Sequence, residues 1–244
     1  MIRDDLRAYV GIISHQRSQN VQAMEALVGA ATWFVGAGEG DEYRDQGATQ
    51  VIESGGLCRS RNAILEEAWG KGYAGLELSD DLKGIKEAYM TKDGKKKARD
   101  VSFETAVDSM HDALFQTGAM MAGVAPTGNP FYWDPAKPIH PKAFIVGDMI
   151  LVRPCELFFD EDMRLKEDYD YTIQHVLKYG RVARCNDILA QFSHRTNSGG
   201  AVAARTPELE QEMIDFLKKK WGTSVIKDNT KRPDEILLNL RSIS

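Results

Sequence analysis

Two adjacent carboxylates follow an apolar stretch of the sequence. Asp80 and Asp81 come after the apolar run 73–78, with Ser79 in between. Adjacent carboxylates repel each other, and a divalent cation, which prefers oxygen ligands, removes that cost. Such a cation can also bridge a diphosphate and neutralise charge on a departing nucleotide. A second interpretation stays open, because Asp is also a preferred capping residue at the start of a helix.

Two arginines open the next candidate segment. Arg59 and Arg61 lie at the start of a stretch with helical spacing, directly after Gly55-Gly56, and Asn62 follows them. Cations at a helix N-terminus oppose the helix dipole, so capping does not explain them. Their chemistry suits phosphate groups or sugar hydroxyls. The alternative is that both are surface arginines.

Acidic residues cluster in the second half of the chain. Glu167, Asp168 and Asp170 fall within four residues, which is more than the dipole of a helix start requires. A carboxylate near an acceptor hydroxyl can act as a general base. His194 follows a predicted strand and precedes Gly199-Gly200, so it is a candidate metal ligand. A polar surface histidine is the more common outcome for such a residue.

The elements that must position these residues are predicted by apolar periodicity. In the first third, strands and helices alternate; the expected strands are 7–13, 31–35, 50–53 and 73–78, and the expected helices are 20–27 and 57–69. This alternation indicates an α/β fold with a mostly parallel sheet. Polar segments 14–17, 36–45 and 79–81 follow three of the strands. They should converge at the carboxyl edge of the sheet, where ligands bind.

The remaining two thirds are less regular. Helices are expected at 103–116, with Ser102 as the cap, at 167–179 and at 207–221, and strands at 120–124 and 143–152. Residues 182–192 are expected to form one or two strands, and residues 236–240 a last strand or a packed tail. The segment 92–100 is expected to be a mobile basic excursion. A loop at 125–141, rich in Pro, Gly and aromatic residues, is long enough to suggest a function.

Composition sets the broad class. The chain has 244 residues, 43% of them hydrophobic, and a net charge of −5, which is ordinary for a globular domain and gives no bulk basic field. No apolar run reaches the length of a membrane span, and residues 1–5 have no signal-peptide core. Three widely spaced cysteines indicate a reducing cytoplasm.

The order of these segments resembles that of GT-A glycosyltransferases, and is most similar to the TET/JBP-associated family related to the base J glucosyltransferase. The resemblance spans residues 9–200. It rests on the segments 14–17, 56–62, 78–82, 159–171 and 180–184 and on Gly199-Gly200. Members of this family are small, often phage-encoded enzymes that modify hydroxymethylated pyrimidines in DNA. The resemblance implies a single GT-A (Rossmann-like) α/β domain over 1–244. Residues 1–90 would bind the nucleotide-sugar, 101–205 would hold the acceptor and the catalytic residues, and 206–244 would form a C-terminal helix and tail.

The resemblance also implies roles for individual residues. Asp81 and His194 would ligate Mn²⁺ or Mg²⁺, and Asp168 would be the catalytic base with Glu167 beside it. The donor, expected to be a UDP-sugar, would contact Ser14, Gln16, Arg17, Arg61, Asn62 and Asp80. The family's Asp-x-Asp motif reads Ser79-Asp80-Asp81 in this chain, so its first acid is missing.

These observations predict a cytoplasmic, metal-dependent glycosyltransferase, in the host cytoplasm if the chain is phage-encoded. It would move a sugar from a nucleotide diphosphate to a hydroxymethylpyrimidine in DNA. The basic residues 95–99 and the aromatic residues 131–133 would hold phosphates and an extruded base. Two alternatives stay open: a GT-A enzyme with a glycan, lipid-linked or protein acceptor, and a nucleotide-binding protein or nucleotidyltransferase.

Overall fold

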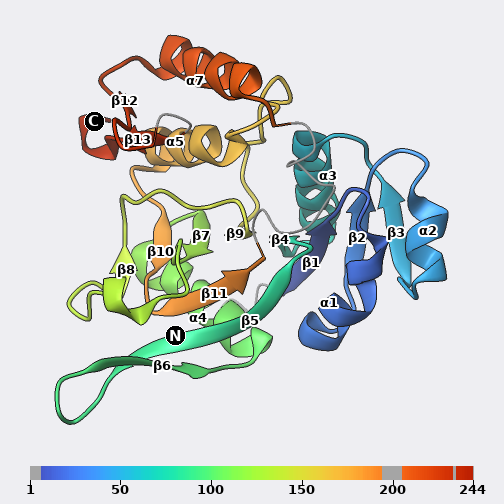
Figure 1. Cartoon of the computed structure of the whole chain (residues 1–244), viewed down its shortest axis with the longest axis horizontal. Helices are drawn as coiled ribbons and strands as arrows, with labels where there is room; N and C mark the ends of the chain where they lie inside the picture. The colour runs from blue at the N-terminus through green and yellow to red at the C-terminus, as the bar shows by residue number, and fades with distance from the viewer. Residues whose placement is uncertain (1–6, 194–204, 233–234, 244) are drawn as a thin grey trace.

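A mixed sheet of eight strands runs through the centre of the molecule (Figure 1). The computed structural model describes residues 7–193, 205–232 and 235–243. In spatial order the strands are β3 (Gln50–Glu53), β2 (Thr32–Val35), β1 (Ala8–Ile13), β4 (Ala74–Ser79), β9 (Met149–Val152), β7 (Met121–Val124), β10 (Ala183–Cys185) and β8 (Ile139–His140).

The sheet is mostly parallel, as predicted, but the direction of its strands changes at β9. Strands β3, β2, β1 and β4 run parallel to one another. Strand β9 is antiparallel to both of its neighbours, β4 and β7, while β7 and β10 are again parallel. The start of β9 therefore lies beside the carboxyl end of β4, where Leu78 pairs with Met149.

Helices cover both faces of the sheet, and alternating side chains explain why. Along β9, Met149 and Leu151 join one hydrophobic cluster, and Ile150 and Val152 join the other. The first cluster receives α1 (Val21–Val28), α2 (Gly40–Asp45) and α4 (Phe103–Thr117). The second receives α3 (Leu57–Gly70), α5 (Glu167–Tyr179) and α7 (Pro207–Trp221). Buried four-residue strands such as β9 have no polar face because both of their sides are covered.

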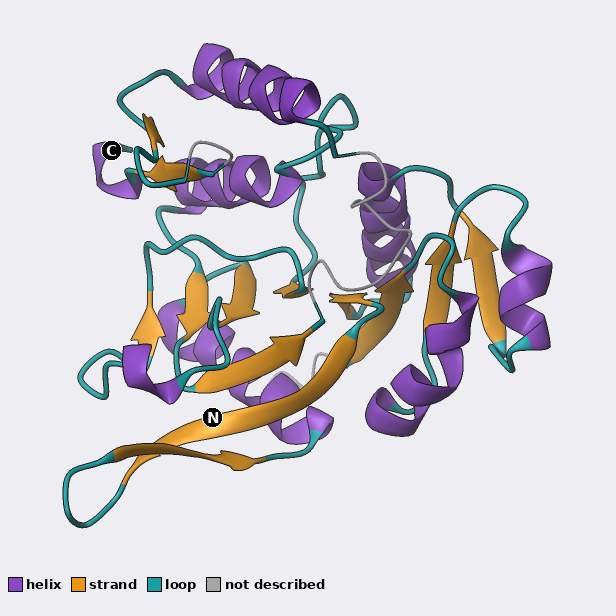
Figure 2. Cartoon of the chain, in the orientation of Figure 1, coloured by secondary structure: helices purple, strands orange, loops and turns teal. Residues whose placement is uncertain are grey.

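Two smaller sheets complete the chain (Figure 2). Strand β5 (Leu82–Met90) pairs antiparallel with β6 (Lys96–Asp100) on one side and with β11 (Ile188–Phe192) on the other. Near the C-terminus, β12 (Ile226–Asp228) and β13 (Ile236–Leu238) form a hairpin. Short 3-10 helices lie at Ser18–Asn20, Pro130–Tyr132 and Leu240–Ser242. Among the described helices, none is long and apolar enough to cross a membrane.

The structure corrects three local predictions. Residues 96–100, expected in a mobile excursion, form β6, which the sequence did not indicate because Ala98 is the one apolar residue of the strand. Residues 40–45, expected as a polar loop, form α2, whose Tyr43 is fully buried. The strand expected at 143–152 is confined to 149–152. By contrast, Ser102 caps α4 as predicted and accepts a hydrogen bond from the Thr105 amide at 3.1 Å.

Candidate active site

The three polar segments meet at the carboxyl edge of the parallel strands, as the topology predicted. Ser14 follows β1, and its amide continues the sheet by donating to the Phe34 carbonyl at 3.0 Å. Its hydroxyl donates to the carboxylate of Asp80, which follows β4. The same hydroxyl lies 2.6 Å from the Tyr43 hydroxyl, on the helix after β2. The Ser14 side chain therefore links the segments that follow β1, β2 and β4.

Asp80 is held from two sides. Besides Ser14, the guanidinium of Arg17 contacts its carboxylate at 3.0 Å. Both side chains of this ion pair are buried. Burial raises the pKa of Asp80, while the Ser14 hydrogen bond and the Arg17 charge act in the opposite direction. These contacts give Asp80 a fixed orientation beside β1.

The loop after β1 is shaped by an unusual backbone conformation. Gln16 has a φ of 56°, and its amide donates to the Glu39 carboxylate at 2.9 Å. The exposed His15 contacts the same carboxylate through its Nδ1 atom. Glu53 in turn anchors the loop before α2 by accepting the Gly40 amide at 3.1 Å. Gln16, which was predicted to bind the donor, therefore has an exposed side chain at the rim of this edge.

Asp81 also lies in the interior of this edge. Its side chain is buried, and its carbonyl accepts a hydrogen bond from the Ser193 amide at 3.1 Å. Ser193 is the residue before His194, the second predicted metal ligand. His194 itself lies outside the described residues. Within the described ranges, no group of three or more His, Cys, Asp or Glu residues has the arrangement of a metal site.

The donor set nevertheless fits the predicted ion. Carboxylate oxygens are the ligands that Mg²⁺ and Mn²⁺ favour. Asp80 already accepts bonds from Ser14 and Arg17, which makes it a poor primary ligand. Asp81 follows it in the chain and is buried at the same edge.

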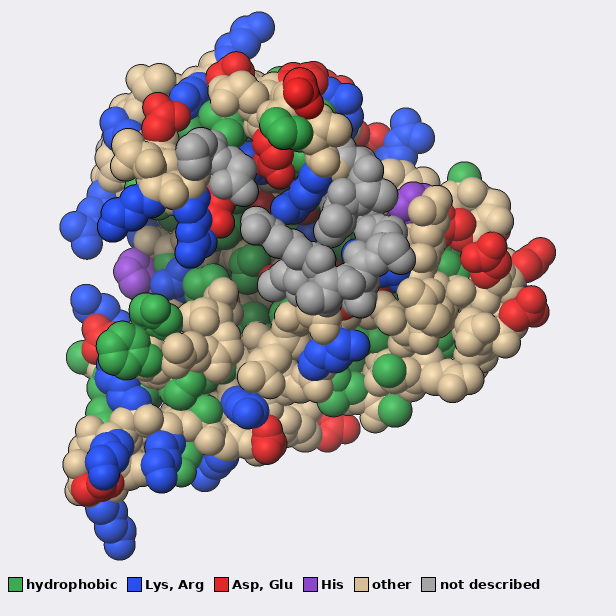
Figure 3. All heavy atoms as spheres, in the orientation of Figure 1, with side chains coloured by type: hydrophobic (Ala, Val, Ile, Leu, Met, Phe, Trp, Pro, Cys, Tyr) green, Lys and Arg blue, Asp and Glu red, His purple; other side chains and the backbone are tan. Residues whose placement is uncertain are grey.

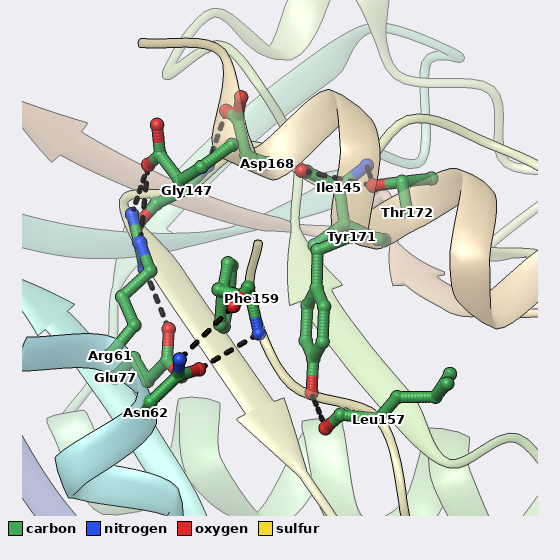
Figure 4. Close-up of polar contacts among 11 residues, drawn as sticks. Arg61, Asn62, Glu77, Ile145, Gly147, Leu157, Phe159, Asp168, Tyr171 and Thr172 are labelled. Atoms are coloured by element: carbon green, nitrogen blue, oxygen red, sulfur yellow. Dashed lines mark hydrogen bonds and ion pairs between the residues drawn. The ribbon is translucent and has the colours of Figure 1, made fainter. Parts of the chain in front are cut away.

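A buried arginine connects the first half of the chain to the second (Figure 4). Arg61, on α3, donates to the Glu77 carboxylate on β4 at 2.6 Å and to the Glu167 carboxylate on α5 at 2.9 Å. It also donates to the Gly147 carbonyl at 2.9 Å. Although burial works against its charge, the two carboxylates raise the pKa of Arg61 above its ordinary value. The guanidinium predicted to contact the donor is thus enclosed by the protein.

Glu77 is the less satisfied partner of Arg61. It lies fully buried on β4, and burial raises its pKa to about 7 despite the adjacent arginine. Among the described residues, its Oε1 has no hydrogen-bond partner. No role was predicted for Glu77, although its position between Leu76 and Leu78 in an apolar strand marks it in the sequence.

Asp168 has the properties expected of a general base. Its half-buried carboxyl accepts hydrogen bonds from the Gly147 and Tyr169 amides, both at 2.9 Å. Burial and the neighbouring Glu167 charge raise the pKa of Asp168 to about 7, although Arg61 acts in the opposite direction. A carboxyl with such a pKa can exchange a proton near neutral pH.

Short backbone links place Asp168 at the same edge as the aspartate pair. Gly147, which binds Asp168, is followed by Asp148, whose carbonyl accepts the Ser79 amide at 2.9 Å. Ser79 directly precedes Asp80. The turn before β9 therefore joins the end of β4 to the start of α5. Acidic groups from two distant parts of the sequence come together here.

The residue before α5 also has an unusual backbone conformation. Lys166, the residue before the helix, has a φ of 62°. Within the described ranges, Lys166 and Gln16 are the non-glycine residues with positive φ. Such conformations cost on the order of 1–3 kcal/mol and cluster at functional sites. Both flank the edge just described.

Asn62 and Arg59, the other two predicted residues of α3, contact the segment before α5. Asn62 donates to the Phe159 carbonyl at 3.0 Å and accepts the Phe159 amide at 2.8 Å, so both ends of its amide bind the backbone. Arg59 forms an exposed ion pair with Glu161 at 3.1 Å. The structure thus uses Asn62 to hold the segment before α5 against α3. Tyr43 and Gly147, which contact the site, were absent from the sequence prediction.

Comparison with known proteins does not extend this picture. No protein-family model matches the chain, and no curated protein matches it significantly.

Proposed function

We propose that the chain is a metal-dependent glycosyltransferase of the GT-A type that transfers a sugar to a hydroxymethylpyrimidine in DNA. The observation that carries the proposal is the placement of Asp168, a carboxyl with a pKa near 7, at the same sheet edge as Asp80 and Asp81. Metal-dependent sugar transfer needs a proton acceptor beside a carboxylate site for a divalent cation. The resemblance described above supplies the acceptor.

Each residue has a defined part in this proposal. The Asp168 carboxylate takes the proton of the acceptor hydroxyl, whose oxygen then bonds to the anomeric carbon of the donor. The bond between that carbon and the diphosphate oxygen breaks, and the diphosphate leaves with its electron pair. A cation on Asp81, together with His194, would supply charge stabilisation to the diphosphate.

The donor nucleoside is assigned to the segment after β1. Ser14 and Arg17 fix Asp80, which would contact the ribose or sugar, while Gln16 lies exposed at the rim. Arg61 is given a different part from the one the resemblance implied. Its guanidinium holds Glu167, the neighbour of Asp168, and the carbonyl of Gly147. We therefore treat Arg61 as a positioning residue for the base.

One observation favours a second candidate. The net charge of −5 disfavours a polyanionic acceptor in general and is compatible with transfer to a glycan. The site chemistry is the same in both cases, so the acceptor alone separates them.

An acceptor screen tests the proposal. The protein is incubated with Mn²⁺ and mixed sugar nucleotides, and the mass of hydroxymethylated DNA and of a glycan panel is measured. An added hexose or pentose on the DNA, lost in Asp81→Ala, is the expected result. No added mass on DNA but a product on a glycan would replace the DNA acceptor with the second candidate. Transfer of a nucleotide, or release of neither sugar nor nucleotide, would overturn glycosyl transfer itself.

A further inference from the structure

The hairpin of β5 and β6 extends from the body of the molecule and ends in a basic turn (Figure 1). Exposed lysines lie at positions 92, 95, 96 and 97. Figure 3 shows Lys and Arg side chains at the lower left, where the hairpin ends. This concentration of positive charge contrasts with the net charge of −5 of the whole chain.

Part of this charge is already compensated. Lys95 pairs with Asp93 at 2.7 Å, and Arg99 pairs with Glu87 at 2.5 Å. Among the described residues, Lys92, Lys96 and Lys97 have no carboxylate within ion-pair distance. The charges of these three exposed ammonium groups are therefore not neutralised by carboxylates of the described residues and can attract an external anion.

Two exposed aromatic rings lie beside these lysines. The 3-10 helix Pro130–Tyr132 packs against β6, and the Lys96 ammonium donates to the Phe131 carbonyl at 3.3 Å. Phe131 and Tyr132 are 70% and 71% exposed, and their rings contact edge to face at 5.3 Å between centroids. Large rings exposed to this extent on a soluble surface indicate a binding surface.

The third aromatic residue of this segment has a structural part. Trp133 packs with Ala98 against a small cluster formed by Ala88, Ala125 and Leu189. Trp133 therefore anchors residues 130–132 to the hairpin. This packing leaves Phe131 and Tyr132 as the rings that a ligand can reach. We call the hairpin together with residues 130–133 the basic arm.

We propose that the basic arm binds single-stranded nucleic acid, with phosphates on Lys92, Lys96 and Lys97 and bases stacked on Phe131 and Tyr132. Positive charge that follows a backbone, combined with exposed aromatic faces, is the arrangement that binds single strands without sequence preference. A lipid surface can also bind lysines and exposed rings, so the test below includes vesicles as a separate ligand. In the proposed reaction this strand is the acceptor, and for that identity alone the inference rests on the proposed function.

The arm also sets a length for the bound strand. Strand β5 begins at Leu82, directly after Asp81, and its last residue, Met90, pairs with Lys96. Eight steps of a strand span about 26 Å. A nucleic acid strand that keeps its stacked spacing of about 3.4 Å covers this distance with about eight nucleotides. An acceptor would therefore contact the arm about eight nucleotides from the base that is modified.

Direct binding in the absence of donor and metal tests the arm. The anisotropy of a fluorescent 20-nucleotide DNA is measured against protein concentration at several salt concentrations. In the variant Lys92→Ala/Lys96→Ala/Lys97→Ala, we expect at least tenfold weaker binding and a salt slope that is smaller by about 2. Phe131→Ala/Tyr132→Ala should weaken binding by at least about fivefold with little change in the slope.

A matched control removes the same charge elsewhere. Lys219, Lys227 and Lys231 are exposed, and in the described part of the chain none of the three forms a salt bridge. Their triple alanine variant should bind like the wild type. Equal binding by the arm variants and this control would overturn the inference, as would wild-type binding to phosphatidylserine vesicles but not to DNA.

Failure of the arm and failure of the proposed function are distinguishable. If the arm variants lose DNA binding but the wild type transfers no sugar to DNA, the arm stands and the reaction is wrong. If sugar transfer proceeds and the arm variants bind DNA normally, the reaction stands and the arm is wrong. If both proposals are correct, DNA strands shorter than about eight nucleotides should bind the wild type as weakly as the longer DNA binds the arm variants.

Discussion

Asp168 is subject to opposing influences that together set its pKa. Burial and the adjacent Glu167 favour the protonated acid, while Arg61 and the Gly147 amide favour the carboxylate. The balance lies near neutral pH, where a small change in the surroundings alters the fraction of active base. Proton transfer at this residue is therefore sensitive to each of its neighbours.

The first prediction concerns the pH dependence of the reaction. A general base acts when deprotonated, so the wild-type rate should fall as the pH drops below about 7, the pKa of Asp168. Asp168→Asn should lower kcat by about 10²–10⁴-fold at pH 8. The measurement is a pH-rate profile of sugar transfer. The exposed Asp162 provides a control, since Asp162→Asn should leave the profile unchanged, and an unchanged profile in Asp168→Asn would remove the base assignment.

The second prediction concerns Gly147. A Cβ at this position would lie 2.6 Å from Arg61 Nη2 and 3.3 Å from Asp168 Oδ2, and the buried Arg61 is held by its carboxylate partners. Gly147→Ala should therefore cost about 1–3 kcal/mol of unfolding free energy and reduce kcat more than KM. Urea denaturation and steady-state kinetics measure the two effects.

Gly84 supplies the matched control for this substitution. Nothing lies within 4 Å of a Cβ built there, so Gly84→Ala should be tolerated. If Gly147→Ala were as stable and as active as Gly84→Ala, the close packing of Arg61 and Asp168 would have no functional importance.

At the scale of elements, helix α3 connects the two halves of the site. Arg61 contacts β4 and α5, and Asn62 binds the backbone before α5. Neither contact is local, since Arg61 and Glu167 are 106 residues apart. The helix thus fixes the distance between the aspartate pair and the base.

The third prediction tests this connection. Arg61→Met would leave Glu77 and Glu167 buried without their cation, and breaking a buried pair in this way costs about 3–5 kcal/mol. The exposed Arg59 lies two residues earlier on the same helix, so Arg59→Met should change stability by less than about 1 kcal/mol. Urea denaturation of both variants makes the comparison. Equal losses would mean that the buried pairs do not stabilise the fold.

Periodicity explains which elements were predictable. Helices α3, α4, α5 and α7 and strands β1 to β4 have clear apolar patterns and were expected close to their observed bounds, whereas β10 occupies only three residues of the expected segment 182–192. Helix α2 has six residues and β6 has a single apolar residue, Ala98, so neither element gives an apolar pattern that stands out from the polar residues around it. Convergence of Ser14 and Asp80 followed from topology. The pairing of Arg61 with Glu77 and Glu167 did not, because buried charge pairing depends on tertiary packing.

At the scale of the whole molecule, one sheet edge collects the polar groups and one hairpin extends away from it. The edge is built from buried, mutually bonded residues, whereas the arm is exposed. This division separates the proposed chemistry from the proposed capture of the acceptor. Changes in the arm should therefore affect acceptor binding without altering donor binding.

The fourth prediction concerns the donor and its metal. A ligand that binds only the folded state stabilises it by about 2.7 kcal/mol at a hundredfold excess over Kd. For a chain of this size, we expect UDP-sugar with Mn²⁺ to raise the melting temperature by about 5 °C or more. Chelation by EDTA or the Asp81→Ala substitution should remove the shift. The arm variant Phe131→Ala/Tyr132→Ala should retain it, and an unaltered shift in Asp81→Ala would exclude Asp81 as the ligand.

The long separation between Arg61 and Glu167 also affects how the chain is made. Synthesis proceeds at about 5–20 residues per second, so roughly 5–20 s pass between the appearance of these two residues. During that interval Arg61 can already meet Glu77 on β4, but the partners of Arg61 and Asn62 in residues 159–167 do not yet exist. The parallel strands can pair early, but α3 cannot be closed over until residues 159–167 emerge from the ribosome. The docking of α5 against α3 is thus also the step that delivers Asp168 to its place, before β11 and α7 have been made.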